Sequence, residues 1–258
     1  MKLNIVPARA GIQWVKLGVQ TFLRQPLALT GLFFMYFMGL SLLSVIPLVG
    51  LVVSLAVVPA ATLGFMAATQ QVNEGRFPLP TVLLVAFRAG QQRFRAMVVL
   101  GCFFAVAVLA INLLVSVAIP IPPLPEKADS HAIMLTPEFQ AQALLTLGLS
   151  TPVSLVFWHA PALVHWYGVS PVKSLFFSTV AVLKNMRAMT VYGLAWLGLM
   201  FAGALVLGLV QAVSVFVASA LLLPYALIMS TMFFASVYFT FRDSFVADTP
   251  PLPETLDE

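Results

Sequence analysis

The stretch that decides the fold is LALTGLFFMYFMGLSLLSVI (27–46), followed by PLVG (47–50) and LVVSLAVVPAATLGFMAATQ (51–70). Neither long run contains an acidic or basic residue. A helix rises about 1.5 Å per residue, so about 20 apolar residues cross a hydrocarbon core of about 30 Å. The strands of a membrane β-barrel would instead alternate in short segments, and these runs do not alternate. Residues 27–70 therefore predict two membrane-spanning helices joined by a tight turn.

Four further apolar runs follow, at residues 96–119, 141–167, 188–210 and 214–241. Of the 258 residues, 61% are hydrophobic and 9% are charged, and the mean hydropathy is +1.01. A soluble domain carries about 25% charged residues, because its surface needs polar cover. The sequence therefore predicts an all-α polytopic membrane protein with six transmembrane helices.

Lysine and arginine lie almost entirely on one side of these six spans, and Lys127 alone falls on the other side. Because short cytoplasmic loops are rich in Lys and Arg, both termini are predicted in the cytoplasm and the segment Pro120–Pro137 outside. The residues on the cytoplasmic side would be Lys2, Arg9, Lys16, Arg24, Arg76, Arg88, Arg93, Arg95, Lys173, Lys184, Arg187 and Arg242.

Three segments of mixed polarity, residues 7–24, 80–95 and 171–187, each start at a proline and lead through an arginine into a span. Their charged and apolar residues recur at helical spacing on opposite sides, which is typical of an amphipathic helix. In the first segment the predicted apolar stripe is Ile12, Val15, Val19 and Phe22. Each segment is thus expected to form an interfacial helix on the cytoplasmic face.

The order of these segments predicts three pseudo-repeated hairpins, each preceded by one such helix, over about residues 7–70, 80–167 and 171–245. Chance similarity among apolar segments is the alternative. We expect a single membrane domain over residues 1–247 and a disordered acidic tail over 248–258, which is rich in proline.

The basic residues of the three segments are candidate contacts for anionic lipid, because the cytoplasmic leaflet attracts each one by about 1 kcal/mol. Topology and anchoring alone are the alternative. The candidates are Arg9, Lys16, Arg24, Arg88, Arg95, Lys173, Lys184 and Arg187.

Small residues recur every fourth position on the second span and form a candidate helix-packing ridge, since small side chains let helices approach closely in lipid. They are Ala56, Ala60, Gly64 and Ala68. Packing within one chain and self-association are both compatible with this ridge.

Polar residues inside the spans are few, and His159, His165, Asn112 and Tyr225 are the candidates for a polar pocket. Two histidines six residues apart point to different sides of a helix, unlike paired metal ligands. No triad, carboxylate pair or phosphate loop can be assembled from the sequence, and no basic stripe interleaved with aromatics indicates nucleic-acid binding. We expect no enzyme activity, no metal and no cofactor.

Five short stretches carry a family resemblance: residues 5–9, 59–64, 159–166, 170–177 and 238–245. They resemble an uncharacterised family of proteobacterial inner-membrane proteins, and the resemblance covers nearly the whole chain up to Phe245. More loosely, the layout is similar to YciC-like six-helix proteins. The resemblance implies a bacterial inner-membrane location and brings no catalytic residues.

These observations favour an inner-membrane protein without catalytic apparatus that organises lipids or protein partners, including copies of itself. The alternative is a channel or uncoupled transporter for a small or lipid-like solute, which a cavity lined by Asn112, His159 or Tyr225 would support.

Overall fold

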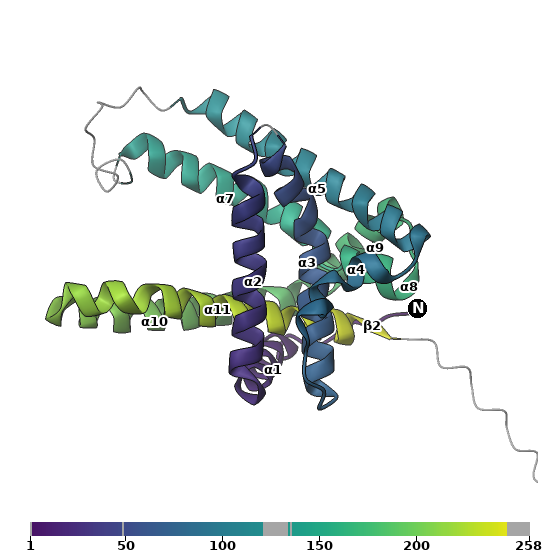
Figure 1. Cartoon of the computed structure of the whole chain (residues 1–258), viewed down its shortest axis with the longest axis horizontal. Coiled ribbons are helices and arrows are strands. Elements are labelled where there is room, and N and C mark those ends of the chain that lie inside the picture. Colours follow the sequence, from purple (N-terminus) through teal and green to yellow (C-terminus); the bar gives the residue numbers. More distant parts are fainter. Residues whose placement is uncertain (1, 48, 121–133, 135, 247–258) are drawn as a thin grey trace, which may run out of the picture. The chain divides into compact units, whose positions relative to one another are not determined.

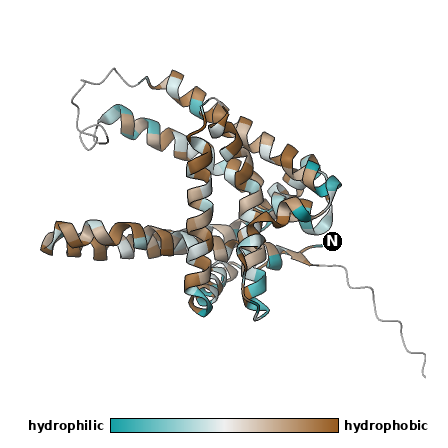
Figure 2. Ribbon diagram, in the orientation of Figure 1, coloured by the Kyte–Doolittle hydropathy of each residue, from teal (hydrophilic) through white to brown (hydrophobic). Residues whose placement is uncertain are grey.

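The computed structural model describes residues 2–47, 49–120, 134 and 136–246, and most of this part of the chain is helical (Figure 1). Within it, six helical segments are long and apolar enough to cross a membrane, and Figure 2 shows them hydrophobic along most of their length. The prediction of an all-α polytopic membrane protein is confirmed. The six are α2 (Pro26–Ser44), α3 (Gly50–Asn73), α5 (Gln91–Ala118), α7 (Pro137–Phe157) with α8 (Ala160–Tyr167), α10 (Met186–Val213) and α11 (Val215–Ser244).

The other elements are shorter. They are β1 (Lys2–Leu3), α1 (Ala10–Arg24), the 3₁₀ helix η1 (Pro80–Leu84), α4 (Val85–Arg88), α9 (Pro171–Lys184) and β2 (Phe245–Val246). The predicted outer segment Pro120–Pro137 lies largely outside the described residues, and the predicted tail 248–258 lies wholly outside them.

The chain divides into two compact units. The terminal unit consists of the described residues of Met1–Phe34, Phe65–Pro80 and Val180–Glu258, and the central unit of those of Met35–Gly64 and Thr81–Thr179. These boundaries fall inside α2, α3, η1 and α9, and they do not follow the three predicted repeats. The threefold repeat therefore stays a prediction.

In the terminal unit, α1 packs against α10 and α11 through small residues. A Cβ built on Gly11 would lie 2.4 Å from the Ala188 carbonyl oxygen, and one built on Gly18 would lie 2.4 Å from the Ser236 Cβ. The side chain of Trp14, between these glycines in the sequence, is fully buried. Only glycine permits so close an approach of two helix backbones.

The apolar stripe predicted for α1 is not the face that packs against α10 and α11, except at Phe22, and its place in an interfacial helix stays a prediction. The buried positions are Ala10, Gly11, Trp14, Gly18, Thr21 and Phe22. Ile12 is 59% exposed, and Val15 and Val19 are only half-buried. Hydropathy favoured the larger aliphatic residues, whereas close helix contact selects the small ones.

The central unit packs α5 against α7 and α8. A Cβ built on Gly101 of α5 would lie 2.1 Å from the Ala56 carbonyl oxygen of α3. At Gly64 of α3 the nearest atom is the Leu83 Cα, 2.9 Å away. The side-chain amide of Gln142 donates to the Ile119 carbonyl oxygen over 2.6 Å, which ties the start of α7 to the end of α5.

The second predicted amphipathic helix, residues 80–95, is not a continuous helix. It is divided into η1, α4 and the first turns of α5, with Gly90 at φ +93° and ψ +159° between α4 and α5. This backbone region is accessible almost only to glycine, so the chain turns there. Arg93 and Arg95 consequently belong to α5.

The fourth span is interrupted at Trp158 and His159. Pro161 has no N–H to bond the carbonyl of Phe157, so α7 ends there and α8 starts with this proline in its first turn. The backbone N–H of His159 instead donates to the Ser178 Oγ over 3.0 Å. Pro59, Pro152 and Pro224, by contrast, lie within uninterrupted helices.

Candidate functional site

Backbone and amide hydrogen bonds join the two ends of the described chain in the terminal unit. Strands β1 and β2 pair antiparallel, with Lys2 opposite Val246. The Asn4 side-chain amide donates to the Asp243 carbonyl oxygen over 2.9 Å. Asn185, which is buried, accepts from the Val6 N–H over 2.9 Å and donates to the Asn4 carbonyl oxygen over 3.0 Å. These contacts hold the segment before α1 against the end of α11.

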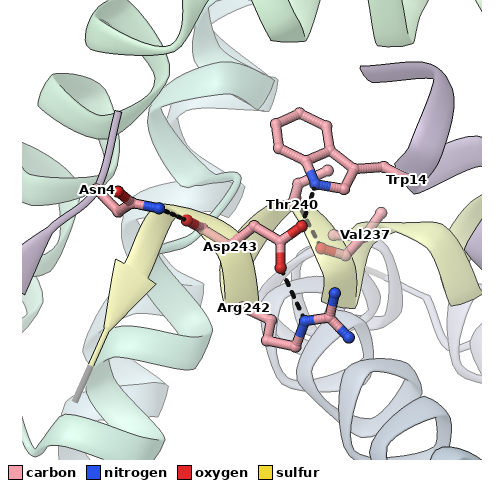
Figure 3. A network of polar contacts seen from close by, with 6 residues as sticks. All are labelled: Asn4, Trp14, Val237, Thr240, Arg242 and Asp243. Carbon is pink, nitrogen blue, oxygen red and sulfur yellow. Dashed lines mark hydrogen bonds and ion pairs between the residues drawn. The ribbon is translucent and has the colours of Figure 1, made fainter. Parts of the chain in front are cut away.

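Asp243 is the polar centre of this region, and Figure 3 shows two side chains directed at its carboxylate. Trp14 Nε1 donates to Oδ2 over 2.8 Å, and Arg242 Nε donates to Oδ1 over 2.8 Å. The guanidinium of Arg242 also lies over the Phe239 ring, 4.9 Å from its centroid. Charge-assisted hydrogen bonds of this kind are strong, so both partners of Asp243 are fixed in orientation.

A second polar contact lies deeper between α10 and α11. The hydroxyls of Tyr192 and Ser236 are 2.6 Å apart, and Trp196 Nε1 donates to the Ser236 Oγ over 3.2 Å. The Tyr192 ring meets Trp14 edge-on at 6.0 Å between centroids. Helix α1 is therefore held by ring contacts as well as by the Trp14–Asp243 hydrogen bond.

A cavity of about 400 Å³ lies between the segment before α1 and the end of α11. Its volume is within the range usual for small-ligand sites. Its polar lining residues are Asn4, Arg9, Gln13, Arg242 and Asp243. Two guanidinium groups outnumber one carboxylate that already accepts two hydrogen bonds, so the cavity offers donors and net positive charge. We call it the Arg9–Arg242 pocket.

The chain is 33% identical to a protein of Burkholderia thailandensis described as a probable inner membrane protein, over 274 aligned positions that cover all of both chains. It belongs to that protein's family. No protein-family profile matches the chain, and no solved structure resembles it closely enough to be matched. Membership of this family and the six apolar spans identify an integral, multi-pass membrane protein. The looser likeness to YciC-like proteins stays a prediction.

The side chains of the basic residues that the sequence predicts to contact anionic lipid are all exposed. Arg9, Lys16, Arg24, Lys184 and Arg187 belong to the terminal unit, and Arg88, Arg95 and Lys173 to the central unit. On α1, the apolar side chains of Ile12 and Leu23 are also exposed, at 59% and 66%. Exposed charged and apolar side chains on one helix are typical of the lipid headgroup boundary.

The predicted polar-pocket residues have separate surroundings. His159 and His165 are buried, whereas Asn112 is exposed and donates to the Val108 carbonyl oxygen of its own helix over 2.8 Å. Tyr225, in the terminal unit, donates to the Met200 carbonyl oxygen over 2.9 Å. The described residues contain no group of three or more His, Cys, Asp or Glu side chains that could hold a metal.

The predicted small-residue ridge on α3 lies in both units. Ala60 and Ala68 are buried, at 1% and 0% exposure. Ala56 and Gly64 contact Gly101 and Leu83 of the same chain. These contacts are intramolecular, and self-association through the ridge stays a prediction.

Sequence reasoning missed Trp14, Asn185 and Asp243, and it assigned Arg242 only a role in topology. One signal was present: the pair Arg242-Asp243 stands directly after an apolar span. Their partner Trp14 is 229 positions from Asp243 in the chain, and no local pattern indicates such a contact.

Proposed function

We propose that this chain is a non-enzymatic protein of the bacterial inner membrane that organises anionic lipid at the cytoplasmic leaflet, with both termini in the cytoplasm. Its similarity to a probable inner membrane protein of Burkholderia thailandensis supports the membrane assignment. The one-sided distribution of Lys and Arg supports the orientation.

The observation that carries the proposal is the way α1 is held. Its small residues and Trp14 pack against α10 and α11, so its orientation in the unit is fixed. The opposite surface exposes Arg9, Lys16 and Arg24 beside the apolar Ile12 and Leu23. A helix fixed in this way presents positive charge at a constant depth in the headgroup region.

The charges involved are sufficient for lipid enrichment. Each basic residue near an anionic leaflet contributes about 1 kcal/mol, and every 1.4 kcal/mol changes an equilibrium constant about tenfold. The three basic residues Arg9, Lys16 and Arg24 alone would therefore enrich anionic lipid around the terminal unit by about a hundredfold, before screening by salt.

The test is lipid analysis of the protein purified in a mild neutral detergent. We expect phosphatidylglycerol or another anionic lipid to be enriched over its share of the source membrane. The triple variant Arg9→Gln, Lys16→Gln, Arg24→Gln should lose most of this enrichment, whereas the control Gln20→Ala, on the same helix, should keep it. Recovery of the wild-type protein with lipid in membrane proportions would refute the proposal.

Transport of a small or lipid-like solute is the second candidate function. It is favoured by the interruption between α7 and α8, where the His159 N–H bonds to Ser178 instead of its own helix, because broken membrane helices form substrate sites in transporters. Release of trapped solutes or flipping of labelled lipid by proteoliposomes would measure it. Rates equal to those of protein-free vesicles would exclude this function.

A further inference from the structure

The Arg9–Arg242 pocket lies where α11 ends and where the chain enters α1, beside the paired strands β1 and β2. We propose that it is a specific site for a phosphate mono- or diester, held by the guanidinium groups of Arg9 and Arg242. This inference deepens the proposed function and rests on it for the lipid source of the phosphate. The phosphate chemistry itself follows from the pocket alone.

Arg242 is oriented before any ligand arrives. Its Nε donates a hydrogen bond to Asp243, and its guanidinium carbon lies over the Phe239 ring. Its side chain is nevertheless 46% exposed, and within the described part of the chain its two terminal amino groups have no hydrogen-bond partner. A planar guanidinium with both terminal groups available matches the oxygens of a phosphate.

Arg9 supplies the second cation that lines the pocket. It precedes the first residue of α1, and its side chain is exposed. The first residue of α1, Ala10, also lines the pocket. Gln13, one turn further along, lines the same cavity and can donate a hydrogen bond from its amide.

The carboxylate of Asp243 repels a bound anion less than a free carboxylate would. Trp14 donates to one of its oxygens and Arg242 to the other. With Arg9 and Arg242 counted as +1 each and Asp243 as −1, the lining residues carry a net charge of +1. Asp243 therefore acts as a positioning residue for Arg242, while the pocket remains attractive to phosphate.

The surroundings of the pocket suit a phosphate attached to an apolar body. Val246 lines the cavity and is 49% exposed, and Ile5, between the lining residues Asn4 and Val6, is 67% exposed. Apolar side chains next to a phosphate site can contact the glycerol and upper acyl carbons of a lipid, whereas a soluble phosphate leaves them in water.

The experiment uses the full chain, delipidated in a neutral detergent, and native mass spectrometry with two ligand arms. One arm titrates phosphatidylglycerol against phosphatidylcholine, and the other titrates glycerol 3-phosphate. We expect Arg9→Gln and Arg242→Gln each to weaken phosphatidylglycerol binding about tenfold, since a hydrogen bond to a charged group is worth that much. Lys16→Gln, on α1 but outside the pocket lining, should weaken it by no more than about fivefold, which is what general attraction of one cation to anionic lipid supplies.

A lipid source predicts tight binding in the first arm and little in the second. Tight, arginine-dependent binding of glycerol 3-phosphate instead would support the site with a soluble ligand. Equal effects of Arg9→Gln and Lys16→Gln would overturn the pocket and leave general attraction to lipid standing. Loss of all anionic-lipid preference in the wild-type protein would instead refute the proposed function.

Because Arg242→Gln also removes a contact of Asp243, Arg9→Lys is the second variant. It keeps the charge, loses the planar fork and leaves the Asp243 contacts untouched. We expect intermediate binding with an unchanged unfolding temperature. Binding equal to wild type would contradict recognition by the Arg9 guanidinium.

Discussion

Helix α1 and the segment from Pro80 to Arg95 have similar sequence patterns and different structures. Pro7 shortly precedes the first and Pro80 begins the second, and both carry basic residues at helical spacing and precede an apolar span. The first is one helix of 15 residues that packs against α10 and α11. The second is divided into η1, α4 and the start of α5. Similar charge patterns thus do not determine how the chain packs.

The difference is explained by glycines at different places. Gly11 and Gly18 lie on one face of the continuous helix α1, where they allow close contact with Ala188 and Ser236. Gly90 instead adopts φ +93°, which ends one helix before the next begins. Glycine therefore allows α1 to pack closely within its unit, whereas in residues 80–95 it separates α4 from α5.

The largest expected effect is the loss of α1 packing in Gly18→Leu. A Cβ at this position would lie 2.8 Å from the Ser236 Cα, so the helices must separate, and we expect a loss of about 3 kcal/mol of stability. Unfolding in detergent, followed by tryptophan fluorescence, measures it. Gly31→Leu is the control, because a Cβ on Gly31 meets nothing within 4 Å. Equal stability of the two variants would show that α1 is only loosely attached.

The next effect concerns the hydrogen bond between Trp14 and Asp243. Trp14→Phe keeps a ring in the core and removes the donor, and a hydrogen bond to a charged group contributes about 2 kcal/mol. A double-mutant cycle with Asp243→Asn isolates the pairwise energy. Strict additivity of the two single variants would mean that this bond does not hold α1 in place.

A smaller effect is expected where residues 80–95 are divided. Gly90→Ala places a side chain in a backbone region that costs about 1 kcal/mol or more, so the central unit should lose that much stability. The control Gly148→Ala changes a glycine inside α7 that has open space around it. A gain in stability and helicity for Gly90→Ala would indicate that α4 and α5 can fuse, as the sequence pattern predicted.

The smallest effect is electrostatic, at the loop that follows α3. Hydrogen bonds from Arg76 and Gln70 hold the pKa of the Glu74 carboxyl below its usual value of 4.5. Because the pKa is lowered in the folded state, this contribution is present above pH 4.5 and is lost as the pH falls through the lowered pKa. Wild type should therefore lose slightly more thermal stability than Glu74→Gln between about pH 7 and about pH 3.5. Parallel curves would contradict this assignment.

The sequence by itself determined the spans and the fold class. Apolar runs near the length of a bilayer must be helices, because every backbone group needs an internal partner in lipid. Each predicted span therefore agrees with the structure within a few residues. The sequence could not tell which proline interrupts the fourth span, because Pro152 and Pro161 each remove a hydrogen bond and only Pro161 separates two helices.

Only the tertiary structure decided which face of α1 is buried, and it alone brought Arg9 and Arg242 to one pocket. Hydropathy and charge spacing are local properties, so they report the depth of a residue relative to the membrane. The contacts of Trp14 with Asp243 and of Asn4 with Asn185 join positions 229 and 181 residues apart. Such pairs depend on how the helices pack, which no local pattern encodes.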